Sequence, residues 1–262
     1  MLKAILFDLD DTLIEWGDYL ARWEEVEARH IESVHRFLTE TVDKPPELED
    51  YFTAYRERTR NAWLDARTSL IAPHIGRVLV ETAVALGVAE NQLDVDRCLD
   101  HYDWRAVPGT RVFSDVEDAL SLLSKRGLVF GLVTNAYQPM RLRDIEMDDH
   151  GLLDFFPTCR ISAADVGYLK PHPSIFEAAL ECLGVEPDQA VFVGDNLTAD
   201  IGGAQAAGML AILRRLPNRN APLSEVIVPD AVVDTLLELP ELFDEWFLDG
   251  WGHRAPDTVD HK

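Results

Sequence analysis

The chain has 262 residues, 47% of them hydrophobic, so it can bury a sizeable core as one large domain or two smaller ones. Its 47 acidic against 24 basic side chains give a formal charge of −23, which argues against nucleic acid and anionic membranes as partners because both would be repelled. The scattered cysteines Cys98, Cys159 and Cys182 show no ligand-like spacing, so we expect free thiols and no structural zinc.

Four short runs of branched apolar residues predict buried strands, with helical patterns between them. One helix opens with Ser114 and Glu117, the spacing of a capping box, and another has Pro173 in its first turn and Gly184 at its end. In chain order these elements are strand 3–7, helix 114–127, strand 128–134, helix 173–184, and strands 190–194 and 210–214. The alternation predicts an α/β fold with a mostly parallel sheet covered on both faces.

The stretch 15–107 breaks this alternation. Its apolar residues recur at helical spacing over long segments, and no convincing strand interrupts them. We therefore predict an all-helical insertion at 15–107 in a core formed by 1–14 and 108–240. A C-terminal extension, 241–262, ends in a polar tail with glycine and proline, which we expect to be flexible.

The insertion carries no motif that names a ligand. Arg56 and Arg60 lie one helical turn apart beside Trp63 and could bind an anionic or aromatic group. A solvated helix face paired with neighbouring glutamates is the commoner explanation of such a pattern.

The chain opens with a predicted strand at Leu2 and not with a secretory signal. No apolar run approaches the length that spans a bilayer. We therefore expect a cytoplasmic protein that acts away from membranes, and the sequence leaves its oligomeric state open.

Chemically suggestive residues follow the predicted strands. Ligands bind at the carboxyl ends of the strands of an open parallel sheet, where the loops leave the core. Residues from distant parts of the chain should therefore meet at this edge. They are Asp8 and Asp10 after the first strand, Thr134 and Asn135 after the second, Lys170 ahead of a helix, and Asp195 and Asp200 after strand 190–194.

Several carboxylates in one crevice repel each other unless a cation compensates. Mg²⁺ fits this role because it prefers oxygen ligands and shares its coordination shell with phosphate. With the metal ion and Lys170 supplying positive charge, a phosphoryl group could approach Asp8, which makes an aspartate nucleophile plausible. Each element alone is more often a helix cap, a turn or an exposed lysine, whereas the full set in this order is hard to explain in that way.

The set resembles the haloacid dehalogenase superfamily, in the subgroup with a helical cap inserted after the first motif. The resemblance covers residues 1–14 and 108–237, and the cap matches in position and helical character alone. It implies a Rossmann-like, doubly wound core with an inserted helical cap. The matching motifs are DxDxT at Asp8 to Thr12, the threonine Thr134, the lysine Lys170, and GDxxxxD from Gly194 to Asp200.

The resemblance also implies a Mg²⁺-dependent phosphohydrolase acting on small phosphorylated metabolites. Asp8 would attack phosphorus to form an aspartyl-phosphate, and Asp10 would protonate the leaving oxygen and later take a proton from water. The remaining roles implied are phosphoryl binding by Thr134, Asn135 and Lys170, Mg²⁺ binding by Asp8, the carbonyl of Asp10 and Asp195, and support of these ligands by Asp200. Thr12 is expected to steady the turn, and Asp11 to lie outside the site.

The presence of Asp10 disfavours a dehalogenase function, because the dehalogenases of this group lack the acid two residues after the nucleophile. A phosphomutase remains an alternative, since the mutases share all four motifs, although they more often carry a small residue at the position of Asp11. A phospho-accepting signalling module and a non-enzymatic interaction protein are further alternatives.

Overall fold

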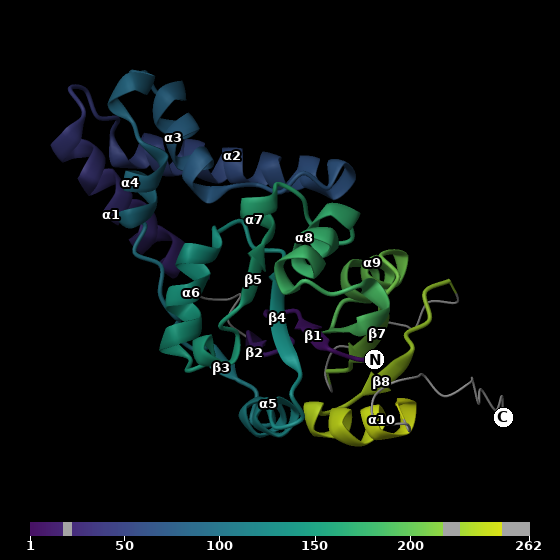
Figure 1. Ribbon diagram of the computed structural model, residues 1–262. Coiled ribbons are helices and arrows are strands. Elements are labelled where there is room, and N and C mark those ends of the chain that lie inside the picture. The colour runs from purple at the N-terminus through teal and green to yellow at the C-terminus, as the bar shows by residue number, and fades with distance from the viewer. Residues whose placement is uncertain (18–22, 217–225, 248–262) are drawn as a thin grey trace.

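The structure is a computed structural model that describes residues 1–17, 23–216 and 226–247. Its centre is a six-stranded parallel sheet with the strand order β5-β4-β1-β6-β7-β8 (Figure 1). The strands are β1 (Ala4–Phe7), β4 (Val129–Thr134), β5 (Cys159–Ser162), β6 (Ala190–Gly194), β7 (Leu210–Arg214) and β8 (Ala231–Val233). The four predicted strands are β1, β4, β6 and β7, and the sequence analysis missed both edge strands, β5 and β8.

Helices cover both faces of the sheet, as predicted for a doubly wound α/β fold. Ile5 and Phe7 of β1 join one buried cluster with α5 and α10, whereas Ala4 and Leu6 join another with α8 and α9. The helices of the core are α5 (Val116–Ser124), α6 (Met140–Asp149), α7 (Ala163–Val166), α8 (Pro173–Leu183), α9 (Gly203–Ala206) and α10 (Leu239–Trp246). Short 3₁₀ helices lie among them, namely η3 (Leu153–Phe155), η4 (Pro187–Gln189) and η6 (Leu236–Glu238). A short π-helix, η5 (Leu197–Gly202), precedes α9.

The helices within 23–100 form a separate group beside the sheet, at the upper left of Figure 1. They bury a hydrophobic cluster of their own, which includes Ile31, Leu79 and Leu99. Tyr137 and Leu142 of the core also belong to this cluster, so the group packs against the loop after β4 and against α6. The group comprises α1 (Trp23–Thr41), α2 (Leu48–Ser69), α3 (Ile75–Ala85), η2 (Glu90–Gln92) and α4 (Val95–Asp100). The expected helical insertion is consistent with this arrangement, and its limits at 15 and 107 stay a prediction.

The two connections between these helices and the core run side by side. The short strands β2 (Ile14–Glu15) and β3 (Arg111–Val112) pair in antiparallel fashion, and the Arg111 side chain reaches Glu15 at 2.6 Å. A second contact joins the α2–α3 loop to the loop before α8, because the Leu169 N–H donates to the Leu70 carbonyl at 2.8 Å. The helical group is therefore attached beside two of the loops that carry the predicted site.

The C-terminal extension begins within α10, which buries Leu239 and Phe243 against the core. The tail that we expected to be flexible lies for the most part outside the described residues. Among the helices that the structure describes, none combines the length and the apolar character needed to cross a membrane.

The predicted helix ends meet different outcomes. Pro173 in the first turn of α8 and Gly184 at its left-handed C-terminal end are confirmed. The capping box at Ser114 and Glu117 is wrong, because α5 begins at Val116. The residue before it, Asp115, makes no capping hydrogen bond and faces the rest of the core.

The Asp115 carboxylate joins three parts of the core. Its Oδ1 accepts from Arg214 at 2.8 Å, and its Oδ2 accepts from the Thr235 hydroxyl at 2.8 Å and the Leu236 N–H at 2.7 Å. Arg214 also donates to the Thr12 carbonyl at 2.7 Å. Burial acts to raise the pKa of Asp115, but these donors outweigh it and hold the pKa below its ordinary value.

Replacing Asp115 by asparagine is expected to lower the free energy of unfolding by about 1.5–3 kcal/mol at neutral pH, since the hydrogen bonds are made to a charged group. Because the folded-state pKa is depressed, this stabilisation is complete above the unfolded value of about 3.9 and disappears as pH falls through the folded value. Urea unfolding of both proteins at about pH 7 and about pH 3 measures the difference. The control Asp118→Asn changes an exposed acid of the same helix and should shift stability by less than about 0.5 kcal/mol. An equal loss at both pH values would contradict the role of the charge.

Candidate active site

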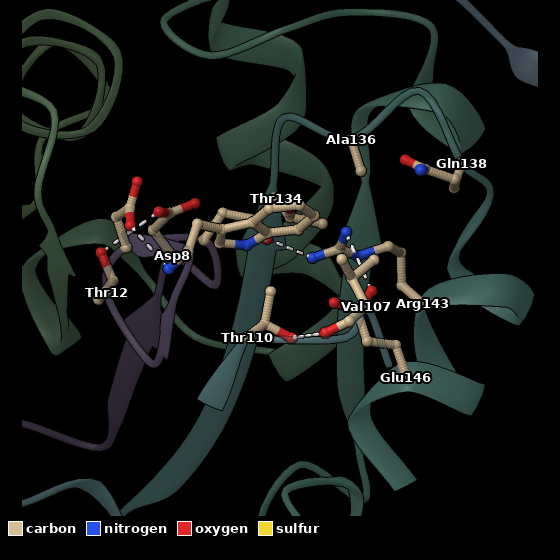
Figure 2. A network of polar contacts seen from close by, with 12 residues as sticks. Asp8, Thr12, Val107, Thr110, Thr134, Ala136, Gln138, Arg143 and Glu146 are labelled. Atoms are coloured by element: carbon tan, nitrogen blue, oxygen red, sulfur yellow. Dashed lines mark hydrogen bonds and ion pairs between the residues drawn. The ribbon is translucent and has the colours of Figure 1, made fainter. Parts of the chain in front are cut away.

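Asp8 follows β1 directly and is 6% exposed. The chain turns back at once, because the Leu9 carbonyl accepts from the Leu13 N–H at 2.8 Å and the Ile14 N–H at 3.0 Å. Within this turn the Thr12 hydroxyl donates to Asp8 Oδ2 at 3.2 Å, at the left of Figure 2. The expectation that Thr12 steadies the turn fits this contact. The turn holds the Asp8 carboxylate at the carboxyl edge of the sheet.

Lys170 lies beside Asp8 although 162 positions separate them. Its ammonium group contacts Asp8 Oδ1 at 2.6 Å, Asp200 Oδ1 at 2.7 Å and the Val133 carbonyl at 2.8 Å. Burial lowers the pKa of Lys170, but Asp200 and Asp8 outweigh burial and raise it above its usual value. The surroundings therefore favour the charged form of the Lys170 ammonium group next to the Asp8 carboxylate.

The Asn135 side chain holds the backbone of Lys170. Its Oδ1 accepts from the Lys170 N–H at 2.7 Å, and its Nδ2 donates to the Lys170 carbonyl at 3.1 Å. Both ends of the amide are thus engaged with one residue. This side chain orients the lysine, so a direct contact of Asn135 with a ligand would come from its backbone N–H.

Three carboxylates gather next to the ammonium group. Asp8, Asp195 and Asp200 each offer an oxygen, and these oxygens lie within 4.8 Å of one another. The Asn196 N–H donates to Asp200 Oδ2 at 2.9 Å, and a Cβ at Gly194 would lie 2.3 Å from the same oxygen, so glycine is needed there.

Burial raises the pKa of Asp8, Lys170 opposes this shift, and the charges of Asp200 and Asp195 add to it. The cluster thus has more negative charge than one ammonium group balances. An all-oxygen donor set of this kind fits a hard divalent cation such as Mg²⁺.

The Asp10 carboxylate is not among these three clustered carboxylates and accepts three hydrogen bonds. Its Oδ1 accepts from Arg143 Nη2 at 2.6 Å and from Trp16 Nε1 at 2.7 Å. Its Oδ2 accepts from the Thr134 hydroxyl at 3.1 Å. Thr134, which we expected to bind a phosphoryl group, thus ends β4 in contact with Asp10.

Sequence reasoning missed the charged pair behind Asp10. Arg143 and Glu146 lie one turn apart on α6, and their side chains, 3.1 Å apart, are 2% and 0% exposed. The Trp104 indole donates to Glu146 Oε2 at 2.8 Å. Burial raises the pKa of Glu146 to about 7, against the opposing effect of Arg143. Figure 2 shows Arg143 and Glu146 together on their helix, with the guanidinium directed toward the site.

The remaining candidates lie elsewhere. Arg56 of α2 pairs at 2.9 Å with Glu27, so it has the expected glutamate partner, but that partner is buried and belongs to α1. Arg60 is exposed. The Asp11 side chain accepts from the Trp16 N–H at 3.2 Å, at the connection to the helical group, as anticipated for a residue outside the site.

A model of the haloacid dehalogenase-like hydrolase family matches residues 2–208. The chain belongs to this family. The resemblance drawn from the four motifs is therefore confirmed, and so is the Rossmann-like fold class. This haloacid dehalogenase-like chain is a hydrolase.

Its relatives include several phosphatases. The chain is 28% identical over 249 residues to the glyceraldehyde 3-phosphate phosphatase of Methanopyrus kandleri, covering 94% of this chain and 98% of the relative. It is also 28% identical over 244 residues to the phosphoglycolate phosphatase of Shigella boydii, covering 91% of each. The comparisons thus support the expectation of a phosphatase.

Among solved structures, the chain is similar to the HAD phosphatase from Thermococcus onnurineus, with a TM-score of 0.60 and 26% identity over 97% of this chain and 100% of the other. It is equally similar in fold to the 2-haloacid dehalogenase from Pseudomonas syringae, with a TM-score of 0.62 and 27% identity over 94% and 100%. Because both chemistries occur on this fold, the site residues have to decide between them.

Proposed function

We propose that this protein is a Mg²⁺-dependent phosphohydrolase that cleaves small-molecule phosphate monoesters through an aspartyl-phosphate intermediate. The observation that carries the proposal is the pair of carboxylates on one turn. Asp8 lies buried against Lys170, and Asp10 follows two residues later with its carboxylate directed to a different set of donors. Two carboxyl groups in different surroundings suit a nucleophile and a proton carrier.

In the first step, an Asp8 oxygen attacks phosphorus, and the bond from phosphorus to the ester oxygen breaks. Asp10 gives its proton to the departing oxygen, which leaves as an alcohol. In the second step water attacks the phosphorus of the aspartyl-phosphate, Asp10 takes the proton of the water, and inorganic phosphate leaves with Asp8 restored. General acid–base catalysis of this kind contributes about 10²- to 10⁴-fold.

The other residues of the site are assigned to binding the phosphoryl group and stabilising its negative charge. We assign Lys170 and the Thr134 hydroxyl to bind the oxygens of the transferring phosphoryl group. The Asn135 side chain supports Lys170 by hydrogen bonds to the Lys170 N–H and carbonyl. The fixed positive charge of Lys170 next to Asp8 stabilises the negative charge that the phosphoryl oxygens carry in the transition state.

Mg²⁺ would be held by Asp8, the carbonyl of Asp10 and Asp195. The Asp200 carboxylate belongs to the same oxygen cluster and is assigned to orienting these ligands, because Lys170 and the Asn196 N–H already bind its two oxygens. When bound, the metal ion would neutralise the carboxylates and the phosphoryl group so that the two can meet.

The acid at Asp10 favours phosphate-ester cleavage over dehalogenation, because a halide leaves without a proton. The substrates named for the relatives, glyceraldehyde 3-phosphate and phosphoglycolate, support a small phosphorylated metabolite as the substrate class. The net charge of −23 disfavours nucleic acid, and a cytoplasmic location remains a prediction. A phosphomutase stays the alternative that the experiment below must separate.

The test is phosphate release from a panel of phosphorylated metabolites, ranked by kcat/KM because discrimination lies in that ratio. We expect turnover with Mg²⁺, loss of turnover with EDTA, and recovery when Mg²⁺ is added in excess. Activity undiminished by EDTA would contradict the metal's role. Isomerised sugar phosphate in place of free phosphate would indicate a mutase, and no turnover of any ester would reject the proposed function.

A further inference from the structure

We propose that Arg143 is a positioning residue that fixes the orientation of the Asp10 carboxylate, and that Glu146 and Trp104 in turn fix Arg143. The inference rests on the proposed function, since it concerns the residue assigned to proton transfer. It adds three residues that the four sequence motifs do not contain.

The first argument is the burial of a charge. The Arg143 side chain is 2% exposed, and a guanidinium removed from water needs charged partners within hydrogen-bond distance. It has two, because Nη2 contacts Asp10 Oδ1 at 2.6 Å and Nη1 contacts Glu146 Oε2 at 3.1 Å. The planar guanidinium thus bridges two carboxylates, which a lysine ammonium on a flexible chain could not do with the same geometry.

The second argument is that Arg143 is held independently of Asp10. Glu146 is on the same helix, one turn away, so α6 alone brings the two side chains together. Glu146 is held in turn by Trp104, which is 1% exposed and whose ring centroid lies 6.0 Å from the Arg143 guanidinium carbon. The guanidinium is therefore also held by contacts that do not involve Asp10.

The third argument is that Asp10 needs outside support. Its side chain is 34% exposed and belongs to a turn, not to a helix or strand. Arg143 and Trp16 donate to its Oδ1, and the Thr134 hydroxyl donates to its Oδ2, so both oxygens are held by donors outside the turn. A group that transfers protons must meet its partner within hydrogen-bond distance, and misplacement by about 1 Å costs about 100-fold.

A buried ion pair could also serve the fold alone, so the test must separate the two roles. The double variant Arg143→Met/Glu146→Gln removes both charges together, which avoids leaving one buried charge unpaired. Glutamine keeps an oxygen for the Trp104 indole. Thermal unfolding then reports the effect on the fold.

The readout is the ratio of kcat/KM for a metabolite monoester to kcat/KM for p-nitrophenyl phosphate. The alkoxide of the metabolite must be protonated as it leaves, whereas p-nitrophenolate leaves without a proton. We expect the double variant to lose about 100-fold on the metabolite and less than about 5-fold on the aryl ester. A purely structural role would lower both values by the same factor.

The matched control is Arg141→Met, which removes another arginine of α6 that pairs with Asp100 at 2.7 Å and does not contact Asp10. Its ratio should equal that of the wild type. Arg143→Lys keeps the charge beside Glu146 and should still lower the ratio, which tests the inference even where the double variant fails to fold. An unchanged ratio in Arg143→Lys, or an equal loss on both esters in the double variant, would overturn it. A wild-type protein that hydrolyses neither ester would instead reject the proposed function.

Discussion

The Asp8→Asn variant is expected to release phosphate at least about 10⁴-fold more slowly than the wild type, because removal of a nucleophile leaves only binding and electrostatic effects. An amide oxygen is a poor nucleophile and cannot form the aspartyl-phosphate. Asparagine keeps the shape of the side chain and an oxygen for Lys170, which lies 2.6 Å away. It also removes one of several clustered negative charges, so the melting temperature should stay the same or rise.

The measurement is phosphate release from p-nitrophenyl phosphate and from the best metabolite, together with thermal unfolding. The matched control is Asp11→Asn, which changes a carboxylate of the same turn that accepts from the Trp16 N–H. Asp11 has a φ of 62°, a left-handed conformation that asparagine adopts well, so the turn should persist and activity should stay near that of the wild type. Turnover retained by purified Asp8→Asn would end the assignment of Asp8 as nucleophile.

The second large effect is expected for Lys170→Met, which should lower activity about 10³-fold and the free energy of unfolding by about 3–5 kcal/mol. The lysine is the only cation that an ion pair joins to Asp8 or Asp200 among the described residues. Without it, two buried carboxylates lose their compensating charge. Urea unfolding and phosphate release measure the two effects separately.

Stability and catalysis can be separated with a second change. Adding Asp200→Asn to Lys170→Met removes one of the unpaired acids, so much of the lost stability should return while activity stays low. Activity that returned together with stability would mean that Lys170 only balances charge in the fold. Lys125→Met, an exposed lysine after α5, is the control and should change neither quantity.

The strands that could be predicted are those buried on both faces. β1, β4, β6 and β7 are runs of branched apolar residues because helices cover both sides of the sheet. β5 lacks such a run, since Arg160 lies within it and pairs with Asp144 at 2.6 Å. β8 has three residues and lies at the edge, so a short apolar segment gave too weak a signal.

The candidate site divides in the same way. Asp8, Thr134, Lys170 and Asp195 could be grouped because the ends of parallel strands converge. The structure brings Asp8 together with Lys170 and Asp195, and Thr134 contacts Asp10. Arg143 was missed because single charged residues on a helix usually face solvent. The sequence did indicate that Arg143 is buried, since it lies three residues after Met140 and four before Met147, on the helix face that these buried residues share. Whether such a charge has a buried partner depends on the tertiary fold.

The strand order also has a consequence for how the protein is made. β1 precedes the other five strands of the sheet in the chain, yet it lies inside the sheet, with Ala4 opposite Val129 of β4 and Ala190 of β6. During synthesis this apolar strand therefore cannot form its hydrogen bonds with β4 or β6 until those strands have left the ribosome. The helices between Trp23 and Asp100 have local contacts and can form in the interval, which shortens the loop that β1 and β4 have to close. We expect the hydrophobic segment Ile5–Phe7 to remain without its partner strands β4 and β6 for longer than any other strand remains unpaired. The helical group is expected to fold during that time.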